Sequence, residues 1–257
     1  MSNVILDQQG PVSRIKLNRP EVRNAFNVEL IQELESSFRQ VEKDPKARVV
    51  VLSGEGGFFC AGADLNWMKS FVGASRETNE KDAQKLVQLL TYLNEFPKPL
   101  VVQVHGAAVG GGVGLVAVAD IAIAVEETLY SLAEVKLGLI PAVISPFVIS
   151  KLGVAAARRY FLTGEKFSNE EAHRYGLIHE EVVSEDLESR TSEIVQNLLS
   201  SGPEAIRESK KLIRKVSSNA GDLTDYTVKK IAELRVSLEA QEGISAFLEK
   251  RKPSWNV

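Results

Sequence analysis

Residues 105–120 read His-Gly-Ala-Ala-Val-Gly-Gly-Gly-Val-Gly-Leu-Val-Ala-Val-Ala-Asp, and the rest of the chain is organised around them. The stretch holds five glycines and no Asp, Glu, Lys or Arg before Asp120. The apolar run before it, residues 100–104, predicts a buried strand, and residues 113–119 predict a buried helix. The first N–H groups of that helix would have no partner within it, so they favour a bound group that carries negative charge.

Two known glycine motifs do not fit this stretch. The dinucleotide pattern G-x-G-x-x-G would need a third glycine where Leu115 stands. Its looser form, with alanine in the third place, is met from Gly112 onward, but this start lies too far beyond the strand predicted at 100–104. The phosphate loop G-x-x-x-x-G-K-S/T would need a lysine at the position of Gly112. An anion site without a cation suits a transient oxyanion better than a polyphosphate, although a tight turn would use the same glycines.

Length, charge and cysteine content set limits on the class of protein. The 257 residues suffice for one large α/β domain or a domain with an appendage, and the net charge of −3 argues against a nucleic-acid surface. The single cysteine, Cys60, fits a reducing compartment and is expected to be a buried filler rather than a nucleophile. Residues 1–7 do not resemble a signal peptide, and glycines interrupt the long uncharged run. We therefore expect a soluble, cytoplasmic protein with no membrane partner.

The elements before residue 100 lead to a second loop of small residues. Residues 4–6 and 12–17 predict a hairpin, and Asn27 is expected to cap a helix. A buried strand is predicted at 49–52, and Ser-Gly-Glu-Gly-Gly-Phe-Phe-Cys-Ala-Gly-Ala-Asp-Leu follows it at 53–65. Two loops of small residues, each directly after a core strand, indicate an α/β architecture.

From Pro146 onward the pattern is mostly helical, with one strand predicted at 177–183. The helices are expected at 146–152, 154–162, 169–175, 186–199, 203–216 and 223–248. Composition changes near residue 200, so the last part of the chain is expected to form a layer for packing or subunit contact.

Three motifs occur in a fixed order: Phe-Cys-Ala-Gly-Ala-Asp-Leu at 59–65, Gly-x-x-x-Gly-Gly-Gly at 106–112 and Glu-Val-Lys-Leu-Gly-Leu-Ile-Pro at 134–141. Their set and spacing resemble the crotonase family, the enoyl-CoA hydratase and isomerase superfamily. The likeness covers essentially the whole chain. It implies a crotonase-like ββα spiral that binds acyl-CoA in residues 1–200 and a helical trimerisation region in residues 201–257. It also implies assembly as a homotrimer or homohexamer.

The resemblance assigns roles to individual residues. It implies that the backbone N–H groups of Ala63 and Gly111 stabilise an enolate-like oxyanion, and that Glu134 is the catalytic acid and base. Without it, a surface acid paired with Lys136 would be the simpler interpretation of Glu134. The coenzyme A moiety arrives as part of the substrate, so no separate cofactor is expected, and no metal-ligand spacing is present. The resemblance also implies further contacts with substrate or coenzyme A, made by Arg23, Ala61, Asp64, Trp67, Gly114, Phe247 and Lys250. Phe247 and Lys250 are expected to make theirs across a subunit boundary.

Gly114 departs from the pattern of typical hydratases, which place a second glutamate three residues after the central glycine. Because a plain hydratase uses two carboxylates to hold and activate water, the usual mechanism is in question. This departure and the sequence Ala-Val-Ile-Ser-Pro at 142–146 resemble the bacterial methylglutaconyl-CoA hydratase branch. We expect hydration of a branched enoyl-CoA such as methylglutaconyl-CoA, with Gly114 leaving room for a substrate carboxylate that assists the water.

Three other functions stay open at this point. One glutamate suffices for a Δ3,Δ2-enoyl-CoA isomerase, and a glutaconyl-type decarboxylase or a non-catalytic acyl-CoA binder would also keep the fold. His105, which precedes the glycines, is expected to brace the loop by a hydrogen bond rather than to act in catalysis.

Overall fold

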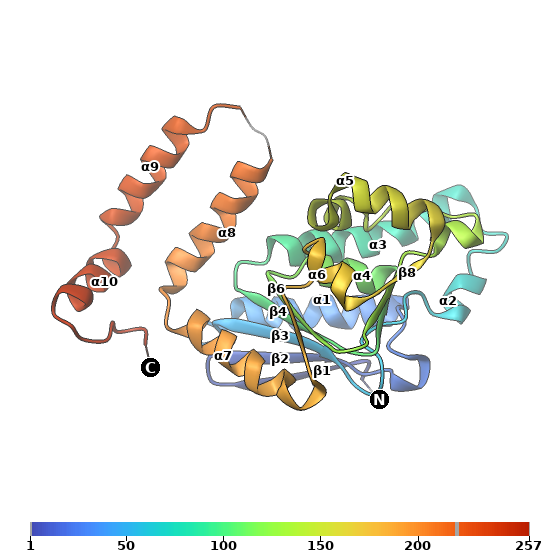
Figure 1. The fold of residues 1–257 in the computed structure, drawn as a ribbon, viewed down its shortest axis with the longest axis horizontal. Helices are drawn as coiled ribbons and strands as arrows, with labels where there is room; N and C mark the ends of the chain where they lie inside the picture. The colour runs from blue at the N-terminus through green and yellow to red at the C-terminus, as the bar shows by residue number, and fades with distance from the viewer. Residues whose placement is uncertain (1, 219–220, 257) are drawn as a thin grey trace.

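A computed structural model describes residues 2–218 and 221–256, and two sheets organise it (Figure 1). In the larger sheet β1 pairs antiparallel with β2, and all other neighbouring strands are parallel. Its order is β1 (Val4–Gln9), β2 (Val12–Leu17), β3 (Val49–Gly54), β4 (Leu100–Val104), β6 (Ile121–Val125) and β9 (Glu180–Val182). The smaller sheet has the order β5 (Ala107–Val109), β7 (Leu129–Ser131) and β8 (Lys166–Phe167).

The chain alternates between the two sheets and then forms a helix. β3 leads to an extended segment at Cys60 that bridges Ala108, β4 leads to β5, and β6 leads to β7. A helix follows each of these pairs: α3 (Arg76–Glu95), α4 (Gly111–Ala117) and α5 (Ser145–Thr163). This repetition is the ββα spiral that the resemblance to the crotonase family implies.

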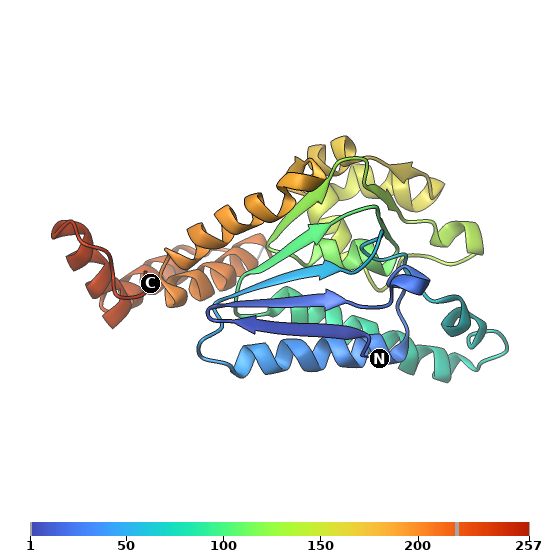
Figure 2. The same ribbon diagram turned by 90° about the horizontal axis from the view of Figure 1, so that it is seen from below.

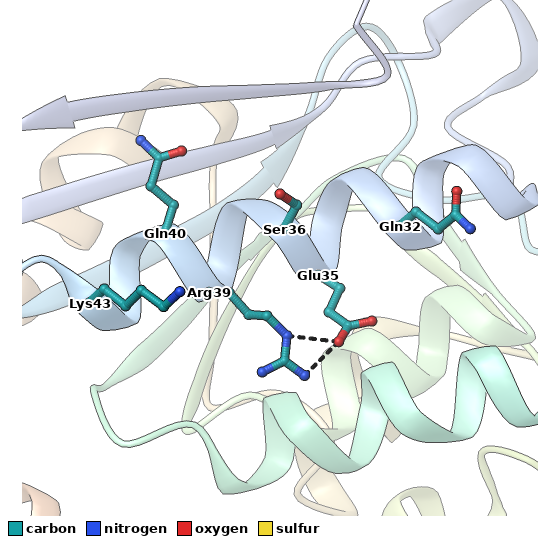
Figure 3. Close-up of a pocket in the computed structure, with 6 residues that line it drawn as sticks. All are labelled: Gln32, Glu35, Ser36, Arg39, Gln40 and Lys43. Atoms are coloured by element: carbon teal, nitrogen blue, oxygen red, sulfur yellow. Dashed lines mark hydrogen bonds and ion pairs between the residues drawn. The ribbon is translucent and has the colours of Figure 1, made fainter.

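Helices cover both faces of the larger sheet, as Figure 2 shows from below. α1 (Val28–Lys43), α3 and α4 pack on one face over the main core, and α7 (Leu187–Leu199) packs on the other. The side chain of Asn27 accepts a hydrogen bond from the N–H of Leu30 at 2.8 Å, so the predicted cap of α1 is confirmed. The outer face of α1 carries a surface hollow (Figure 3) lined by polar side chains of that helix alone: Gln32, Glu35, Ser36, Arg39, Gln40 and Lys43.

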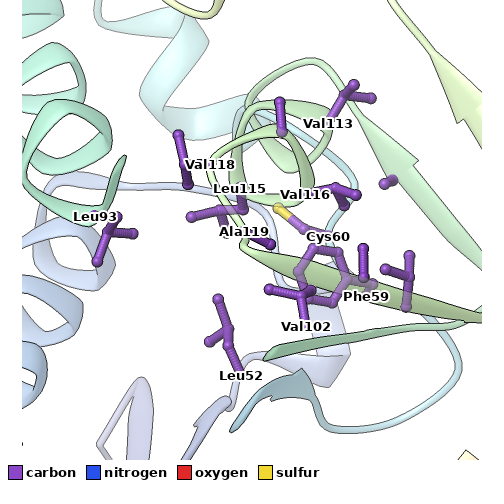
Figure 4. Close-up of a cluster of buried hydrophobic side chains, with 14 of the residues drawn as sticks. Leu52, Phe59, Cys60, Leu93, Val102, Val113, Leu115, Val116, Val118 and Ala119 are labelled. Atoms are coloured by element: carbon purple, nitrogen blue, oxygen red, sulfur yellow. The ribbon is translucent and has the colours of Figure 1, made fainter. Parts of the chain in front are cut away.

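Cys60 lies in the main core (Figure 4), where it is fully buried among apolar side chains. Burial raises the pKa of its thiol to about 12, so the thiol stays neutral near pH 7. The prediction of a buried filler is confirmed.

The C-terminal helices α8 (Pro203–Ser217), α9 (Thr224–Arg235) and α10 (Leu238–Leu248) project from the body of the molecule (Figure 1). The single helix predicted at 223–248 is wrong, because the chain is extended at Ser237 and the Ser237 side chain caps α10 by accepting from the N–H of Ala240. The two helices predicted at 146–152 and 154–162 are both present within α5, because the backbone is not helical at Gly153, where φ is 73° and ψ is 164°. The division of the chain near residue 200 stays a prediction.

The shorter elements complete the fold. The strand predicted at 177–183 is shorter, since β9 spans Glu180–Val182. The remaining helices are η1 (Pro20–Val22), α2 (Leu65–Lys69), η2 (Glu134–Leu137), α6 (Asn169–Arg174) and η3 (Ser184–Asp186).

Replacing Gly106 with alanine is expected to destabilise the protein by roughly 2 to 6 kcal/mol, from backbone strain and overpacking together. Gly106 has a φ of +65°, and a methyl group there would overlap the carbonyl oxygen of Gly57. Gly10→Ala is the matched control, because Gly10 has a φ of +62° with open space around it. Urea unfolding should show a much smaller loss for Gly10→Ala. Equal losses would contradict the close contact.

Candidate active site

Three extended segments lie side by side and lead into the candidate site. The N–H of Cys60 donates to Ala107 at 3.1 Å and the N–H of Val109 donates to Cys60 at 2.9 Å, while β5 pairs in parallel with β7. Beyond the ends of these segments come Ala63, Gly111 and Glu134 respectively. Because parallel neighbours end at one edge, groups from three distant parts of the sequence gather there.

Ala63 has a backbone N–H that is directed away from its neighbouring segment. Phe26 forms a parallel bridge with Ala63, in which the N–H of Phe26 donates to Gly62 at 2.6 Å and the N–H of Asp64 donates to Phe26 at 2.8 Å. Ala63 stands between the two residues that bond to Phe26, so its own N–H is directed to the side opposite Phe26. This N–H has no partner among the described residues. Ala63 is exposed, so a ligand can approach this donor.

Gly111 supplies a second N–H group that has no partner in the described part of the chain. It is the first residue of α4, so its N–H has no acceptor within the helix, and none is found elsewhere in residues 2–218 and 221–256. The preceding N–H, of Gly110, donates to Ser131 at 2.9 Å. That bond ties the turn to β7, so the start of α4 has a fixed position relative to Glu134.

Glu134 begins η2, three residues after β7, and its carboxyl is partly buried. Oε1 lies 3.0 Å from where a methyl group on Gly110 would be, and Oε2 is buried without a hydrogen-bond partner in the described part of the chain. Burial raises the pKa of this carboxyl, as desolvation disfavours the charged form. Among the described residues Glu134 is half-buried, its Oε2 has no partner and it makes no ion pair with Lys136, so the interpretation as a paired surface acid is wrong.

The space expected beside Gly114 is filled. Gly114 is buried in α4, and a methyl group on it would lie 2.6 Å from Cγ2 of Ile144 and 3.3 Å from Cδ1 of Leu90. Ile144 itself is 3% exposed. The expectation that Gly114 leaves room for a substrate carboxylate is therefore wrong, because an apolar side chain from the start of α5 occupies that volume.

Asp64 holds the loop together. One carboxylate oxygen accepts from the N–H of Asn66 at 2.7 Å and caps α2, and the other pairs with Arg19 at 2.8 Å. Burial alone would raise the pKa of Asp64, but the bonds from Arg19 and from the backbone outweigh it and lower this pKa. The carboxylate expected to contact substrate is thus engaged within the chain. Sequence reasoning missed Arg19, for which the Asn-Arg-Pro motif at 18–20 was the available signal.

Arg23 and Ala61, expected to contact coenzyme A, do lie together. The N–H of Ala61 donates to the carbonyl of Arg23 at 2.9 Å, and the guanidinium of Arg23 lies 4.9 Å from the ring centre of Phe58. Trp67, on α2, packs against the main core, and its buried indole N–H has no partner among the described residues. Contact of these residues with a ligand stays a prediction.

Phe247 and Lys250 lie far from the other site residues within this chain. Both belong to the C-terminal end, where Phe247 of α10 is 82% exposed, and Figures 1 and 2 place α10 and α2 at opposite ends of the molecule. His105 behaves as predicted, with Nε2 2.9 Å from the carbonyl oxygen of Gly56.

Metal and membrane sites are not evident in the part of the chain that the structure describes. In that part no group of three His, Cys, Asp or Glu side chains could hold a metal ion. None of its helices combines the length and apolarity needed to cross a membrane.

Comparisons with known proteins agree with this architecture. The family model described as enoyl-CoA hydratase/isomerase matches residues 7–257. The crystal structure of an enoyl-CoA hydratase from Shewanella pealeana superposes with a TM-score of 0.95 at 39% identity, covering 98% of this chain and 96% of that one.

Curated relatives give the same family. An enoyl-CoA hydratase of Alternaria alternata is 34% identical over 95% of this chain and 80% of its own length. The 2,3-dehydroadipyl-CoA hydratase of Escherichia coli is 31% identical over 99% of both chains. The fold is that of the crotonase superfamily. Within it, the chain belongs to the enoyl-CoA hydratase/isomerase family and is an enzyme of that family.

Proposed function

We propose that this enzyme adds water to an enoyl-CoA, with the N–H groups of Ala63 and Gly111 holding the thioester oxygen and Glu134 moving the protons. The observation that carries the proposal is the gathering of two N–H groups and one buried carboxyl oxygen, all without a partner in residues 2–218 and 221–256, at the ends of three paired segments. One preorganised donor of this kind stabilises a transition state by about 3 to 4 kcal/mol.

The proposed steps balance with a single carboxyl group. Ionised Glu134 accepts a proton from water while the water oxygen bonds to the β-carbon of the enoyl group. The electron pair of the double bond moves to the thioester oxygen, where the two N–H groups stabilise the enolate. The enolate collapses as its α-carbon takes the proton from Glu134, which leaves the carboxylate ready for another turnover.

The acyl group is proposed to be branched, as in methylglutaconyl-CoA. The sequence likeness of Gly114 and residues 142–146 to that branch supports this proposal. The relative named 2,3-dehydroadipyl-CoA hydratase supports hydration as the reaction. Ile144 and Leu90 fill the volume beside Gly114, so a carboxylate on the substrate would have to bind elsewhere.

A Δ3,Δ2-isomerase is the second candidate, and the filling of the space at Gly114 by Ile144 favours it. Glu134 would remove a proton from the α-carbon of a 3-enoyl-CoA, and the double bond would shift as the same proton returns to the γ-carbon. This reaction needs one carboxyl group and no water.

Incubation with crotonyl-CoA, methylglutaconyl-CoA and a 3-enoyl-CoA, followed by mass spectrometry, tests the proposal. Hydration adds the mass of one water. An isomer of unchanged mass would favour the second candidate, and loss of carbon dioxide would indicate a decarboxylase. Binding without turnover of any of these thioesters would overturn the catalytic assignment.

The pH dependence of kcat/KM follows from the raised pKa of Glu134. Hydration needs the ionised carboxylate, so activity should fall as the pH drops through this pKa. We expect the acidic limb to lie above the ordinary glutamate value of 4.5 and to be absent from the residual activity of Glu134→Gln. Initial rates at saturating and limiting substrate check this, and a limb at or below the ordinary value would contradict it.

We also propose that the projecting helices mediate a homotrimer or homohexamer. The exposed apolar side chains of these helices support this: Ile213, Val216, Val228, Ile231, Leu238, Ile244, Phe247 and Leu248. Burial of such a surface against another subunit would be favourable, and it would allow Phe247 and Lys250 to reach coenzyme A on a neighbour. Light scattering should give the mass of three or six chains, and a monomer would rule the assembly out.

A further inference from the structure

We propose that Phe26 is a positioning residue that sets the separation between the two oxyanion N–H groups. The inference rests on the proposed function, because it concerns the donors of Ala63 and Gly111. Phe26 contacts both of them, one through its backbone and the other through its ring.

The backbone of Phe26 fixes the loop that carries Ala63. The N–H of Phe26 donates to the carbonyl of Gly62 at 2.6 Å, and the carbonyl of Phe26 accepts from the N–H of Asp64 at 2.8 Å. Ala63 lies between Gly62 and Asp64, so its peptide cannot rotate without breaking one of these bonds. Arg19 strengthens the attachment, since its guanidinium bonds to the carbonyl of Ala25 and to the carboxylate of Asp64.

The ring of Phe26 supports the start of α4. A methyl group on Gly111 would lie 3.0 Å from both Cδ2 and Cε2 of this ring, so the ring lies directly against the backbone of Gly111. The side chain of Phe26 is 1% exposed and belongs to the main core, so surrounding atoms hold the ring in place. Close-packed interiors transmit small displacements, so removal of the ring would let Gly111 shift.

Phe26→Ala tests the role of the ring, and Phe38→Ala is the matched control. Phe38 is 0% exposed and packs edge-on against Phe96 at 5.1 Å between ring centres, in the same core. A misplacement near 1 Å can lower a rate about 100-fold, so kcat of Phe26→Ala should fall roughly 10- to 100-fold with a much smaller change in KM. Phe38→Ala should lose stability but keep its kcat per folded molecule. Equal kcat values in the two variants would overturn the proposal.

A double-mutant cycle with Gly111→Ala keeps the test independent of folding losses in Phe26→Ala. The added methyl group presses on the ring in the single variant and fits the vacated space in Phe26→Ala/Gly111→Ala. The kcat of the double variant should therefore be at least 10-fold higher than the value obtained by multiplying the losses of the two single variants. Such coupling is expected only for residues in contact. Additive effects would overturn the proposal. Phe26→Leu, a smaller truncation, should give an intermediate kcat, and a kcat at or below that of Phe26→Ala would count against the role of ring size.

A spectroscopic measurement separates this inference from the proposed function. Isotope-edited infrared spectra of bound butyryl-CoA, which is saturated and does not react, report how strongly the thioester carbonyl is polarised. The wild type and Phe38→Ala should share a lowered carbonyl frequency, and Phe26→Ala should lose most of that shift. No shift in the wild type would refute the oxyanion donors themselves, whereas an equal shift in Phe26→Ala would refute only the positioning role.

Discussion

Glu134→Gln is expected to lower kcat by about 10²- to 10⁴-fold, the usual contribution of a positioned acid or base, with little change in KM. The amide has the size of the carboxyl but can neither accept the proton of water nor return one to the α-carbon. The two N–H groups on Ala63 and Gly111 remain, so binding of the thioester should persist.

The same variant should be at least as stable as the wild type at neutral pH. Because burial raises the pKa of Glu134 in the folded state, the carboxyl favours folding only while it is protonated. This contribution to stability is fully present below pH 4.5 and is lost as the pH rises through the raised pKa of Glu134. The amide of Glu134→Gln is neutral at every pH, so the variant avoids this loss. Urea unfolding measures this directly.

Glu126→Gln is the matched control for Glu134→Gln, because Glu126 is exposed in the turn after β6. It should leave both kcat and stability unchanged. Wild-type kcat in Glu134→Gln would show that another group transfers the proton, and a large loss of stability would show that the buried carboxyl is structural.

Gly114→Glu alone is expected to destabilise the protein by more than about 2 kcal/mol, since overpacking and an unpaired buried carboxyl add together. The new side chain would meet Cγ2 of Ile144 at its first carbon. Gly114→Glu/Ile144→Ala removes that atom and should recover stability relative to Gly114→Glu, although Ile144→Ala alone creates a cavity and should lose about 2 to 5 kcal/mol.

The double variant also tests the missing second acid. With a carboxylate in the vacated space, the activity on crotonyl-CoA should rise relative to methylglutaconyl-CoA, because water then has two carboxylates to hold it. Ile144→Ala alone is the control for pocket size and should not change this ratio. A Gly114→Glu single variant as stable as the wild type would contradict the packing, and an unchanged ratio in the double variant would contradict the role of the second acid.

Local patterns predicted several of the helices, strands and loops, whereas the spiral arrangement was implied by the resemblance to the crotonase family. The cap at Asn27 and the loops after β3 and β4 depend on residues a few positions apart, so local sequence and small side chains reveal them. The break at Ser237 was missed because the apolar pattern continues across it.

The errors at the site concern contacts between distant segments. The sequence places a glycine at 114, but only the fold brings Ile144 against it, and only the fold turns Asp64 toward Arg19. The sequence shows where small and acidic residues stand, but it does not show whether another segment fills the space beside them.

The register of the segment at 60–63 has a consequence for how this protein can evolve. Its bridges to Ala108 and Phe26 are backbone bonds, which most substitutions preserve. A one-residue insertion or deletion between Cys60 and Ala63 would change this register. The N–H directed into the candidate site would then belong to a neighbouring residue, or the N–H of Ala63 would turn to the opposite side. Among natural variants, point substitutions at the exposed Ala63 should therefore be tolerated far more often than changes in the length of this loop.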